Sequence, residues 1–349
     1  MARLLLQQLA RTLLATWLLA SAVFLLSRAN QELAIRQALP ETTDMSAAAP
    51  TPGQLLASQA ALRHRLGLDL PLFYVGHRPA SAGAAPGPWR WYGRRNQYHR
   101  WLGALLRGDL GTSFRTGQPV AARLGRALAF TLPLTGMAAL LATLAALGLA
   151  VQLAANPSWQ RLARPVLVAV HALPLFVVAL ALLLLLANPD FLAWFPAYAG
   201  APAAGYFRPE ALPGLVLPVA ALVLAALPEL TLQLEASLAH ELRQPYVVTA
   251  RAKGLSIGAV VRRHALRNAL LPTLTQLAAL LPAMVAGAVV VETVFALPGM
   301  GRLLAEAATN HDYPVLVGGV LLVGTTRLLA LLLADFSYSQ ADPRIRWQR

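Results

Sequence analysis

Residues 127–155 read ALAFTLPLTGMAALLATLAALGLAVQLAA, an apolar run without a charged side chain. A helix needs roughly 20 apolar residues to cross the hydrocarbon core of a bilayer, and this run is long enough. In hydrocarbon every backbone amide must be paired within its own segment, which favours a helix. A transmembrane β-barrel would need alternating apolar and polar residues, whereas Leu180–Leu186 is apolar on all sides. The stretch therefore predicts a membrane-spanning helix.

The composition of the whole chain agrees with that prediction. The 349 residues are 57% hydrophobic and only 13% charged, with a mean hydropathy of +0.55, whereas soluble domains are about a quarter charged. The absence of cysteine excludes a disulfide-stapled scaffold. A formal net charge of +14 would suit a nucleic-acid binder, but the charges are confined to the gaps between apolar runs. We therefore predict an integral membrane protein that binds no nucleic acid.

Apolar runs between the charges predict six membrane-spanning helices. They are Thr12–Ser27, Ala127–Ala155, Pro165–Pro189, Ala211–Pro228, Asn268–Val291 and Tyr313–Ala334. The first run has an alternative interpretation, because Ala20-Ser21-Ala22 resembles the cleavage site of a signal peptide. The apolar run continues through Leu26, past that site, and this favours a retained helix. The predicted fold class is an all-α integral membrane protein.

The distribution of arginine predicts that both termini lie in the cytoplasm. Arginine is abundant near both termini and in the loops before the third and fifth helices, whereas the short outer loops hold only Arg208 and Arg302. The segment from Arg28 to Arg126 runs against this bias, because it is basic and must lie outside. Long segments translocate largely regardless of charge, so the predicted orientation holds.

The predicted domain organisation follows from these spans. The first helix occupies 1–28, a periplasmic segment 29–125, a core of five spanning helices 126–336, and a cytoplasmic tail 337–349. The periplasmic segment contains Ala/Pro/Gly-rich stretches at 40–52 and 79–88, for which we predict flexible loop. It also contains an aromatic group interleaved with arginine: Trp89, Trp91, Tyr92, Tyr98 and Trp101. These aromatic residues predict either an interfacial belt or a stacking platform.

A basic, moderately polar segment lies between the fourth and fifth helices. It is Glu241–Pro272, ELRQPYVVTARAKGLSIGAVVRRHALRNALLP. Pro245 suits the first turn of a helix, and Gly254 suits a left-handed stop. Ser256 is a good N-cap for a second helix. The segment therefore predicts a short helix, a break and another helix.

Two alternative roles remain for this segment. A short helix that exposes the small residues Ala250 and Ala252 would fit a groove of a partner protein. The alternative is a cationic loop that lies on anionic membrane lipid. In the second predicted helix, apolar and polar residues recur at intervals of three and four. They are Val260, Val261, His264, Ala265 and Asn268.

The amino-acid sequence of this segment resembles that of a known family. Thr249–Ser256 and Arg263–Pro272 are similar to the cytoplasmic coupling loop of binding-protein-dependent ABC importer permeases, in the dipeptide/oligopeptide/nickel branch. Further resemblances to that branch occur in the expected order: Leu106–Ser113, Gly117–Val120, Val291–Gly301, Asp312–Pro314, Asp335, Tyr338 and Asp342–Arg346. The chain departs from the branch at Val248, at Gln244-Pro245 and at Arg327, and residues 40–95 have no counterpart there.

The resemblance implies a six-helix type I permease fold, of the first permease subunit type, in a bacterial inner membrane. It implies a second, homologous permease subunit, two cytoplasmic ABC ATPases and a periplasmic substrate-binding protein, with transport by alternating access. The chain itself is not expected to hydrolyse ATP, because a P-loop needs Gly-Lys-Ser/Thr and the sole lysine, Lys253, is followed by Gly254. By the same matching, the ATPase would contact Thr249, Ala250, Arg251, Ala252, Lys253, Gly254, Leu255 and Ser256.

Two further residues are candidates for the pore or its gate. Arg327 lies deep in the last predicted span, where it would line the pore or pair with a carboxylate, since charges within membranes are costly. Glu292 has the family position of a gate residue, but a charge at a helix end by the membrane interface is the simpler interpretation. We predict no cofactor and no metal, since His240-Glu241 lacks the second histidine of a zinc helix at Gln244.

The predicted function is the permease subunit of an ATP-driven, binding-protein-dependent importer, with peptides as its cargo. The same fold could instead import nickel or antimicrobial peptides. An ion-coupled secondary transporter is disfavoured, because it would need carboxylates near mid-membrane and spans two to five have uncharged cores. A membrane-embedded enzyme is disfavoured because no span pairs a nucleophile with a base at helical spacing.

Overall fold

The computed structural model describes residues 2–29, 70–77, 89–196, 212–270 and 288–341, together with the single positions 53, 57, 60 and 61. The chain divides into two compact units. The larger unit comprises residues 1–16, 124–306 and 322–349, and the smaller unit comprises residues 17–123 and 307–321.

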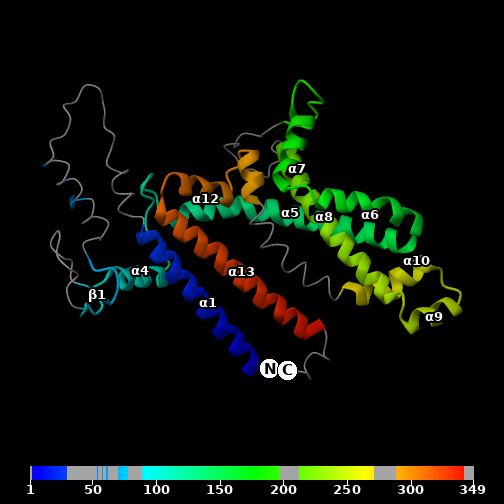
Figure 1. Ribbon diagram of the computed structural model, residues 1–349, viewed down its shortest axis with the longest axis horizontal. Coiled ribbons are helices and arrows are strands. Elements are labelled where there is room, and N and C mark those ends of the chain that lie inside the picture. The colour runs from blue at the N-terminus through cyan, green and yellow to red at the C-terminus, as the bar shows by residue number, and fades with distance from the viewer. Residues whose placement is uncertain are drawn as a thin grey trace. The chain divides into compact units, whose positions relative to one another are not determined.

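The described residues are mostly helical (Figure 1). The larger unit is built from α5 (Val120–Ala155), α6 (Pro157–His171), α7 (Leu175–Leu182), the π-helical η1 (Leu183–Ala187), α8 (Leu212–Glu241), α9 (Pro245–Ala252), α10 (Ile257–Val260), the π-helical η2 (Val261–Ala265) and α12 (Met300–Thr309). The smaller unit contains β1 (Val75–His77), β2 (Trp89–Trp91) and α4 (Gln97–Leu106). Both units take residues from α1 (Ala2–Ala29) and α13 (Tyr313–Ala341), and the first residues of α5 and the last residues of α12 belong to the smaller unit.

Two helices in the described residues are long and apolar enough to cross a membrane. They are α5, with 36 residues, and α8, with 30 residues. The predicted helices at 12–27, 127–155 and 313–334 lie within α1, α5 and α13. Most of the predicted fifth span, residues 271–287, lies outside the described residues, so the count of six spans stays a prediction.

The prediction of one continuous span over Pro165–Pro189 is wrong. This stretch contains the end of α6, a break at 172–174, and then α7 with η1, and the two helical parts are bent by 100°. The physical cause lies at Pro174, which has φ −59° and ψ 140°. Proline has no amide hydrogen and disfavours helical backbone at the residue before it, so the helix stops and restarts. A third span exists only if this bent pair counts as one.

The helix that contains the predicted fourth span extends beyond Pro228, because α8 continues to Glu241. Glu229 and Glu235 lie inside this helix. Pro218 and Pro228 are both accommodated within α8, as membrane helices tolerate proline where neighbouring groups satisfy the freed backbone. The helix continues beyond its most apolar part, so hydropathy indicates the span and not the end of the helix.

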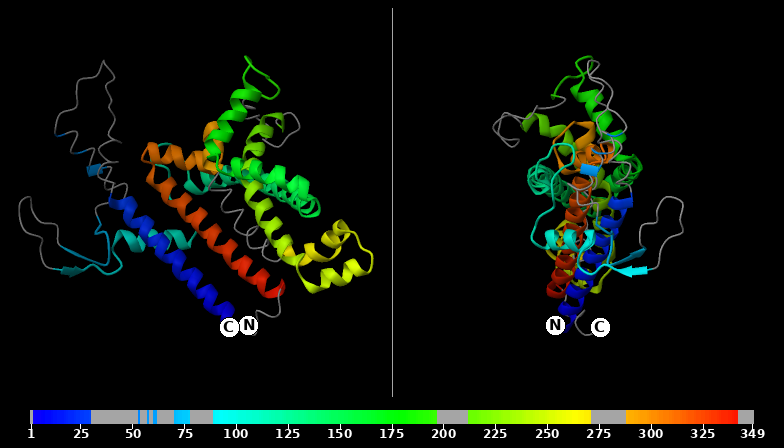
Figure 2. Two further views of the ribbon diagram at one scale, coloured as in Figure 1. Left: turned by 45° about the vertical axis from the view of Figure 1, so that its right-hand side comes forward. Right: turned by 90° about the vertical axis from the view of Figure 1, so that its left-hand side faces the viewer.

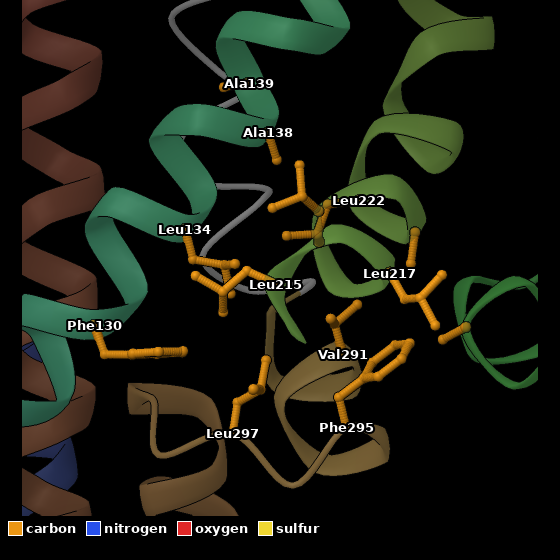
Figure 3. Packing of buried hydrophobic residues seen from close by; sticks show 13 residues of the cluster. Phe130, Leu134, Ala138, Ala139, Leu215, Leu217, Leu222, Val291, Phe295 and Leu297 are labelled. Atoms are coloured by element: carbon orange, nitrogen blue, oxygen red, sulfur yellow. The ribbon is translucent and has the colours of Figure 1, made fainter. Parts of the chain in front are cut away.

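The core of the larger unit lies where α5, α8 and the segment 291–297 meet. Figure 3 shows Leu134 of α5, Leu215 and Leu222 of α8, and Val291 and Phe295 converging on one another, and all of these side chains are buried. Small residues of α5 in the same cluster, Ala138 and Ala139, keep the helices close. A second cluster joins α5 and α8 to η2 and the residues after it through Ala150, Leu234, Leu238, Val261, Ala265 and Ala269.

The smaller unit corrects the all-α prediction in one detail. β1 and β2 form a two-stranded antiparallel sheet in which Val75 is opposite Trp91. The predicted aromatic residues differ in exposure. Trp89 and Trp91 are exposed on β2, whereas Tyr98 of α4 is buried and packs edge-on against Phe24 of α1, with 5.3 Å between the ring centroids. The stretches 40–52 and 79–88 lie outside the described residues.

α1 and α13 pack together in the smaller unit. Ala20 of α1 lies in one apolar cluster with Val317 and Leu321 of α13. Figure 2 shows the two helices side by side and running in opposite directions. Trp101 and Leu105 of α4 cover the same cluster. The first and last helices of the described chain are thus direct neighbours in this unit.

Candidate functional site

The segment after α8 has the local geometry that its sequence predicts. We call residues 242–256 the α9 loop. Gln244 is extended, Pro245 occupies the first turn of α9, and a proline there loses no helical hydrogen bond. Gly254 has φ +85°, in the left-handed region, and its amide donates to the carbonyl of Arg251 at 2.9 Å. Both predictions, of a helix start at Pro245 and a stop at Gly254, are confirmed.

The second helix also begins as predicted, and the turn that follows determines which of its residues are buried. Ser256 caps α10, since its Oγ accepts a hydrogen bond from the amide of Ala259 at 3.4 Å. The turn that follows is π-helical, Val261–Ala265. A π turn has one residue more than an α turn, so the face that begins at Val260 continues at Ala265. Of the residues that recur at intervals of three and four, Val260, Val261 and Ala265 are buried, whereas His264 and Asn268 are exposed.

Polar and apolar contacts hold α9 in place. Val247 and Ala250 of α9 are buried against Val260 of α10. The Tyr246 hydroxyl donates to Oε2 of Glu241, the last residue of α8, at 2.7 Å. Asn268 Nδ2 donates to the same oxygen at 3.3 Å. Burial, followed by the hydrogen bond to the Glu241 carboxylate, raises the pKa of Tyr246. One carboxylate thus joins α8, α9 and the helix after η2.

The structure divides the predicted ATPase-contact residues into two faces. Six of them are exposed: Thr249, Arg251, Ala252, Lys253, Gly254 and Ser256. Leu255 is half-buried, and Ala250 is only 8% exposed. The prediction that Ala250 and Ala252 are both exposed is therefore wrong for Ala250, which packs inward beside Val247. Val248, one turn before Ala252, is 70% exposed and adds an apolar side chain to the outer face.

The second candidate site is centred on Glu292, which is completely buried. Its Oε1 accepts a hydrogen bond from Thr131 Oγ1 of α5 at 2.6 Å. Its Oε2 accepts from the amides of Gly301 at 2.7 Å and Arg302 at 3.1 Å. Glu292 is therefore not an exposed charge within the described residues. The carboxylate instead caps the start of α12, where free amides and the helix dipole favour a negative charge.

Close packing around this carboxylate explains the glycines of residues 298–301. A Cβ on Gly299 would lie 2.0 Å from Oε1 of Glu292, and a Cβ on Gly301 would lie 2.3 Å from Cα of Val289. Thr131 Oγ1 also accepts from the amide of Met300 at 2.8 Å. We call Thr131, Glu292 and residues 299–302 the Glu292 cluster. Sequence reasoning missed Thr131, although a threonine within the apolar run of α5 is a signal for a polar contact between helices.

In the smaller unit, a buried aspartate joins two sequence motifs that the resemblance had noted separately. Asp312 is 2% exposed, and it accepts from Ser113 Oγ at 2.5 Å and from the amide of Phe114 at 3.0 Å. Arg123 Nη1 lies 3.0 Å from Oδ2 of Asp312. The start of α13 is thereby tied to the loop before α5. Sequence reasoning missed Arg123 as the partner of this carboxylate.

Arg327 lies on α13, but its side chain and that of Asp335 are outside the described residues. Its role in the pore stays a prediction. Of the predicted site residues, the structure therefore describes two regions in the larger unit. One is the exposed short helix after α8, and the other is the buried carboxylate of Glu292 that fixes the start of α12.

Comparison with known proteins assigns the family. Residues 125–347 match the family described as "Binding-protein-dependent transport system inner membrane component". The oligopeptide transport system permease protein OppB of Haemophilus influenzae is 34% identical over 263 residues, which cover 72% of this chain and 80% of that protein. The di/tripeptide transport system permease protein DppB of Pseudomonas aeruginosa is 33% identical over 307 residues, covering 82% and 84%. AppB of Bacillus subtilis, an oligopeptide transport system permease protein, is 33% identical over 256 residues, covering 72% and 80%.

The family match spans most of the larger unit, including the α9 loop and the Glu292 cluster. A system of this kind comprises an ATPase and a binding protein besides its membrane component. The chain is therefore a member of the binding-protein-dependent transport family, an inner-membrane permease subunit whose ATPase activity lies in a separate subunit.

Proposed function

We propose that this chain is the first permease subunit of an ATP-driven importer of peptides. The relatives named above are permeases of oligopeptide and di/tripeptide transport systems, and they match most of the chain. Nickel and antimicrobial peptides are the alternative cargoes for the same fold. Membership of the family disfavours an ion-coupled secondary transporter.

The proposed topology has six spans, with both termini in the cytoplasm. The first helix is 1–28, the periplasmic segment is 29–125, the permease core is 126–336 and the cytoplasmic tail is 337–349. The exposed basic side chains around α9 and η2 support a cytoplasmic position for this region. These side chains are Arg243, Arg251, Lys253, Arg262, Arg263 and Arg267.

The α9 loop is the proposed contact with the ATPase, and its geometry is the observation that carries the proposal. Val248 and Ala252 form a small apolar face, with Arg251 and Lys253 beside it, of a size that fits a groove in a partner. The opposite face is fixed to α8 and α10 by the apolar cluster and by the Glu241–Tyr246 hydrogen bond. Movement of the ATPases would therefore move α8 and α5 with α9, and the pore would alternate between inward-open and outward-open states.

The Glu292 cluster is the proposed support of the outer gate. Its hydrogen bonds tie α12 to α5, so α12 moves only as α5 moves. For Arg327 two roles remain proposed, a pore-lining charge that attracts the carboxylate of a peptide, and a partner to a carboxylate on this chain or on the second permease subunit.

The test is transport by the complete assembly in proteoliposomes. This chain, a homologous second permease subunit, two ABC ATPases and the periplasmic binding protein are reconstituted, and uptake of labelled di- and oligopeptides is measured. We expect uptake that requires both ATP and the ATPases. Full uptake in the absence of the ATPases contradicts the proposal of an ATP-driven importer. Uptake of nickel but of no peptide contradicts the proposed cargo.

A further inference from the structure

We propose that the outward face of α6 is a binding site for an anionic phospholipid. One side of α6 packs against α8, where Leu167 is buried. Beside this contact α6 carries a groove of about 670 Å³, which is lined by Gln160, Arg161, Arg164, Pro165, Val168, Ala169 and Ala172. The groove is a feature of the larger unit alone. The sequence comparisons assign no ligand to it.

Two arginines form the polar end of this groove. Arg161 and Arg164 are three residues apart, so their side chains lie on one face of the helix. Both are exposed, and within the part of the chain that the structure describes neither forms an ion pair. Glu235 lies on the α8 side of α6, where it is buried and accepts a hydrogen bond from Gln160 at 2.5 Å. The two guanidinium groups are therefore available to an anion from outside the described chain, and guanidinium groups bind phosphate oxygens in pairs of hydrogen bonds.

The other end of the groove is apolar. Val168, Ala169 and Ala172 follow the arginines, and the helix rises by roughly 12 Å from Arg164 to Ala172 at 1.5 Å per residue. The alanine side chains are small, and this makes room for the groove. The larger side chains of Leu162 and Val166 beside it are 69% and 58% exposed. Charge at one end and an apolar channel beyond it match a phospholipid, with its phosphate at the arginines and an acyl chain along the alanines.

Trp159 supports this orientation of the lipid. It lies in the first turn of α6 and is 64% exposed, and exposed tryptophan is characteristic of the headgroup level of a membrane. An acidic protein surface would satisfy the arginines but would leave the apolar channel without a partner. In the proposed topology the start of α6 faces the cytoplasm, and the lipid would then lie in the inner leaflet of the membrane. The presence of the lipid site does not depend on that topology.

The test measures lipid binding to the purified transporter assembly by native mass spectrometry. The assembly is titrated with phosphatidylglycerol and, separately, with phosphatidylcholine. Each hydrogen-bonded contact between a guanidinium group and the lipid phosphate contributes about 1 kcal/mol. The double variant R161Q/R164Q is therefore expected to bind phosphatidylglycerol about 30-fold more weakly, and binding of phosphatidylcholine is expected to change little.

Two matched variants separate a site from general attraction between basic residues and lipid. R262Q/R263Q removes the same charge from exposed positions on η2 and is expected to leave the affinity within about twofold. Ala169→Trp fills the apolar channel without a change of charge and is expected to abolish the preferential binding of phosphatidylglycerol. Equal losses in the two arginine double variants contradict the proposal, and so does unchanged binding in Ala169→Trp.

A protein partner at this face would give another result. If R161Q/R164Q released a subunit of the assembly and left lipid binding unchanged, the proposal of a lipid site would be wrong. Peptide uptake is measured on the same samples. If the native protein shows no preferential binding of phosphatidylglycerol but intact ATP-dependent uptake, only this inference is wrong. If it binds the lipid but shows no ATP-dependent uptake, only the proposed function is wrong.

Discussion

The α9 loop and the Glu292 cluster carry similar sequence signals but use them in opposite ways. Each combines glycine with charged residues. In the α9 loop the charged and small residues are mostly exposed, and the glycine serves a left-handed turn. In the Glu292 cluster the carboxylate is completely buried, and the glycines make room for it. The same residue types thus indicate a recognition surface in one region and close internal packing in the other.

The difference predicts how each region responds to mutation. Changes in the Glu292 cluster are expected to act first on folding, because they alter a buried contact. Changes on the outer face of the α9 loop are expected to act on coupling to the ATPase, with the fold retained. The following variants test this division, in order of decreasing effect.

Gly299→Ala is expected to have the largest effect. Its Cβ would lie 2.0 Å from Oε1 of Glu292, so α12 must move or the carboxylate must lose its hydrogen bonds. Overpacking and a disrupted buried network together cost about 3 kcal/mol or more. The measurement is the thermal unfolding midpoint of the purified chain. Gly136→Ala on α5, where a Cβ meets nothing within 4 Å, is the control and should match the original protein. Equal stability of the two variants would contradict the packing that we describe.

Gly254→Val is expected to abolish coupling while the chain still inserts and folds. A β-branched residue at φ +85° is strained by roughly 1–2 kcal/mol, so the turn after α9 rearranges. Peptide uptake per ATP hydrolysed, in the reconstituted assembly, is expected to fall at least about tenfold. Gly258→Val, on α10 and also without a neighbour within 4 Å of its Cβ, serves as the control. If the Gly254 variant retained full ATP-driven uptake, the assignment of the α9 loop would be wrong.

Val248→Ser is expected to weaken the binding of the ATPase without a change in stability. Val248 is 70% exposed in this chain, and burial of a valine in a partner groove contributes about 1.5–3 kcal/mol. The expected loss of ATPase affinity is about tenfold, measured by titration of the detergent-purified permease pair. Leu106→Ser, at an apolar residue that is 80% exposed at the end of α4, should leave the affinity unchanged. An equal loss in both variants would indicate a general effect of surface polarity.

Tyr246→Phe is expected to have the smallest effect. It removes the hydrogen bond to Glu241, while Asn268 remains bonded to the same carboxylate oxygen. The expected loss of stability is about 1 kcal/mol, with a slight loss of coupling. Tyr313→Phe is the control, because the Tyr313 hydroxyl forms no hydrogen bond within the described residues. A loss as large as that of Gly299→Ala would show that α9 depends on this bond far more than its contacts suggest.

The sequence predicts the α9 loop well because its geometry is local. Pro245, Gly254 and Ser256 each act on their own turn of backbone, and each takes the predicted position. The error at Ala250 has a different origin. Which face of α9 is buried depends on Val260, which packs against it from the next helix, and the π turn that follows has no clear sequence signal.

The Glu292 cluster was not predictable in the same way, because its partners are distant in the sequence. Thr131 is 161 residues away from Glu292, and only the fold brings them together. The bend before α7 shows a related limit. Pro174 ends a helix, whereas Pro218 and Pro228 lie within α8, so the presence of proline alone does not separate a break from a tolerated proline.

The most direct test of the account is the accessibility of the α9 loop. The chain has no cysteine, so Lys253→Cys introduces a single thiol, and Ala308→Cys on α12 supplies the outer control. A membrane-impermeant maleimide is applied to spheroplasts and to inverted vesicles, with and without bound ATPase. The account predicts that Cys at 253 reacts only in inverted vesicles stripped of ATPase, and that Cys at 308 reacts only in spheroplasts. Labelling of position 253 in spheroplasts, or in inverted vesicles with ATPase bound, would contradict it.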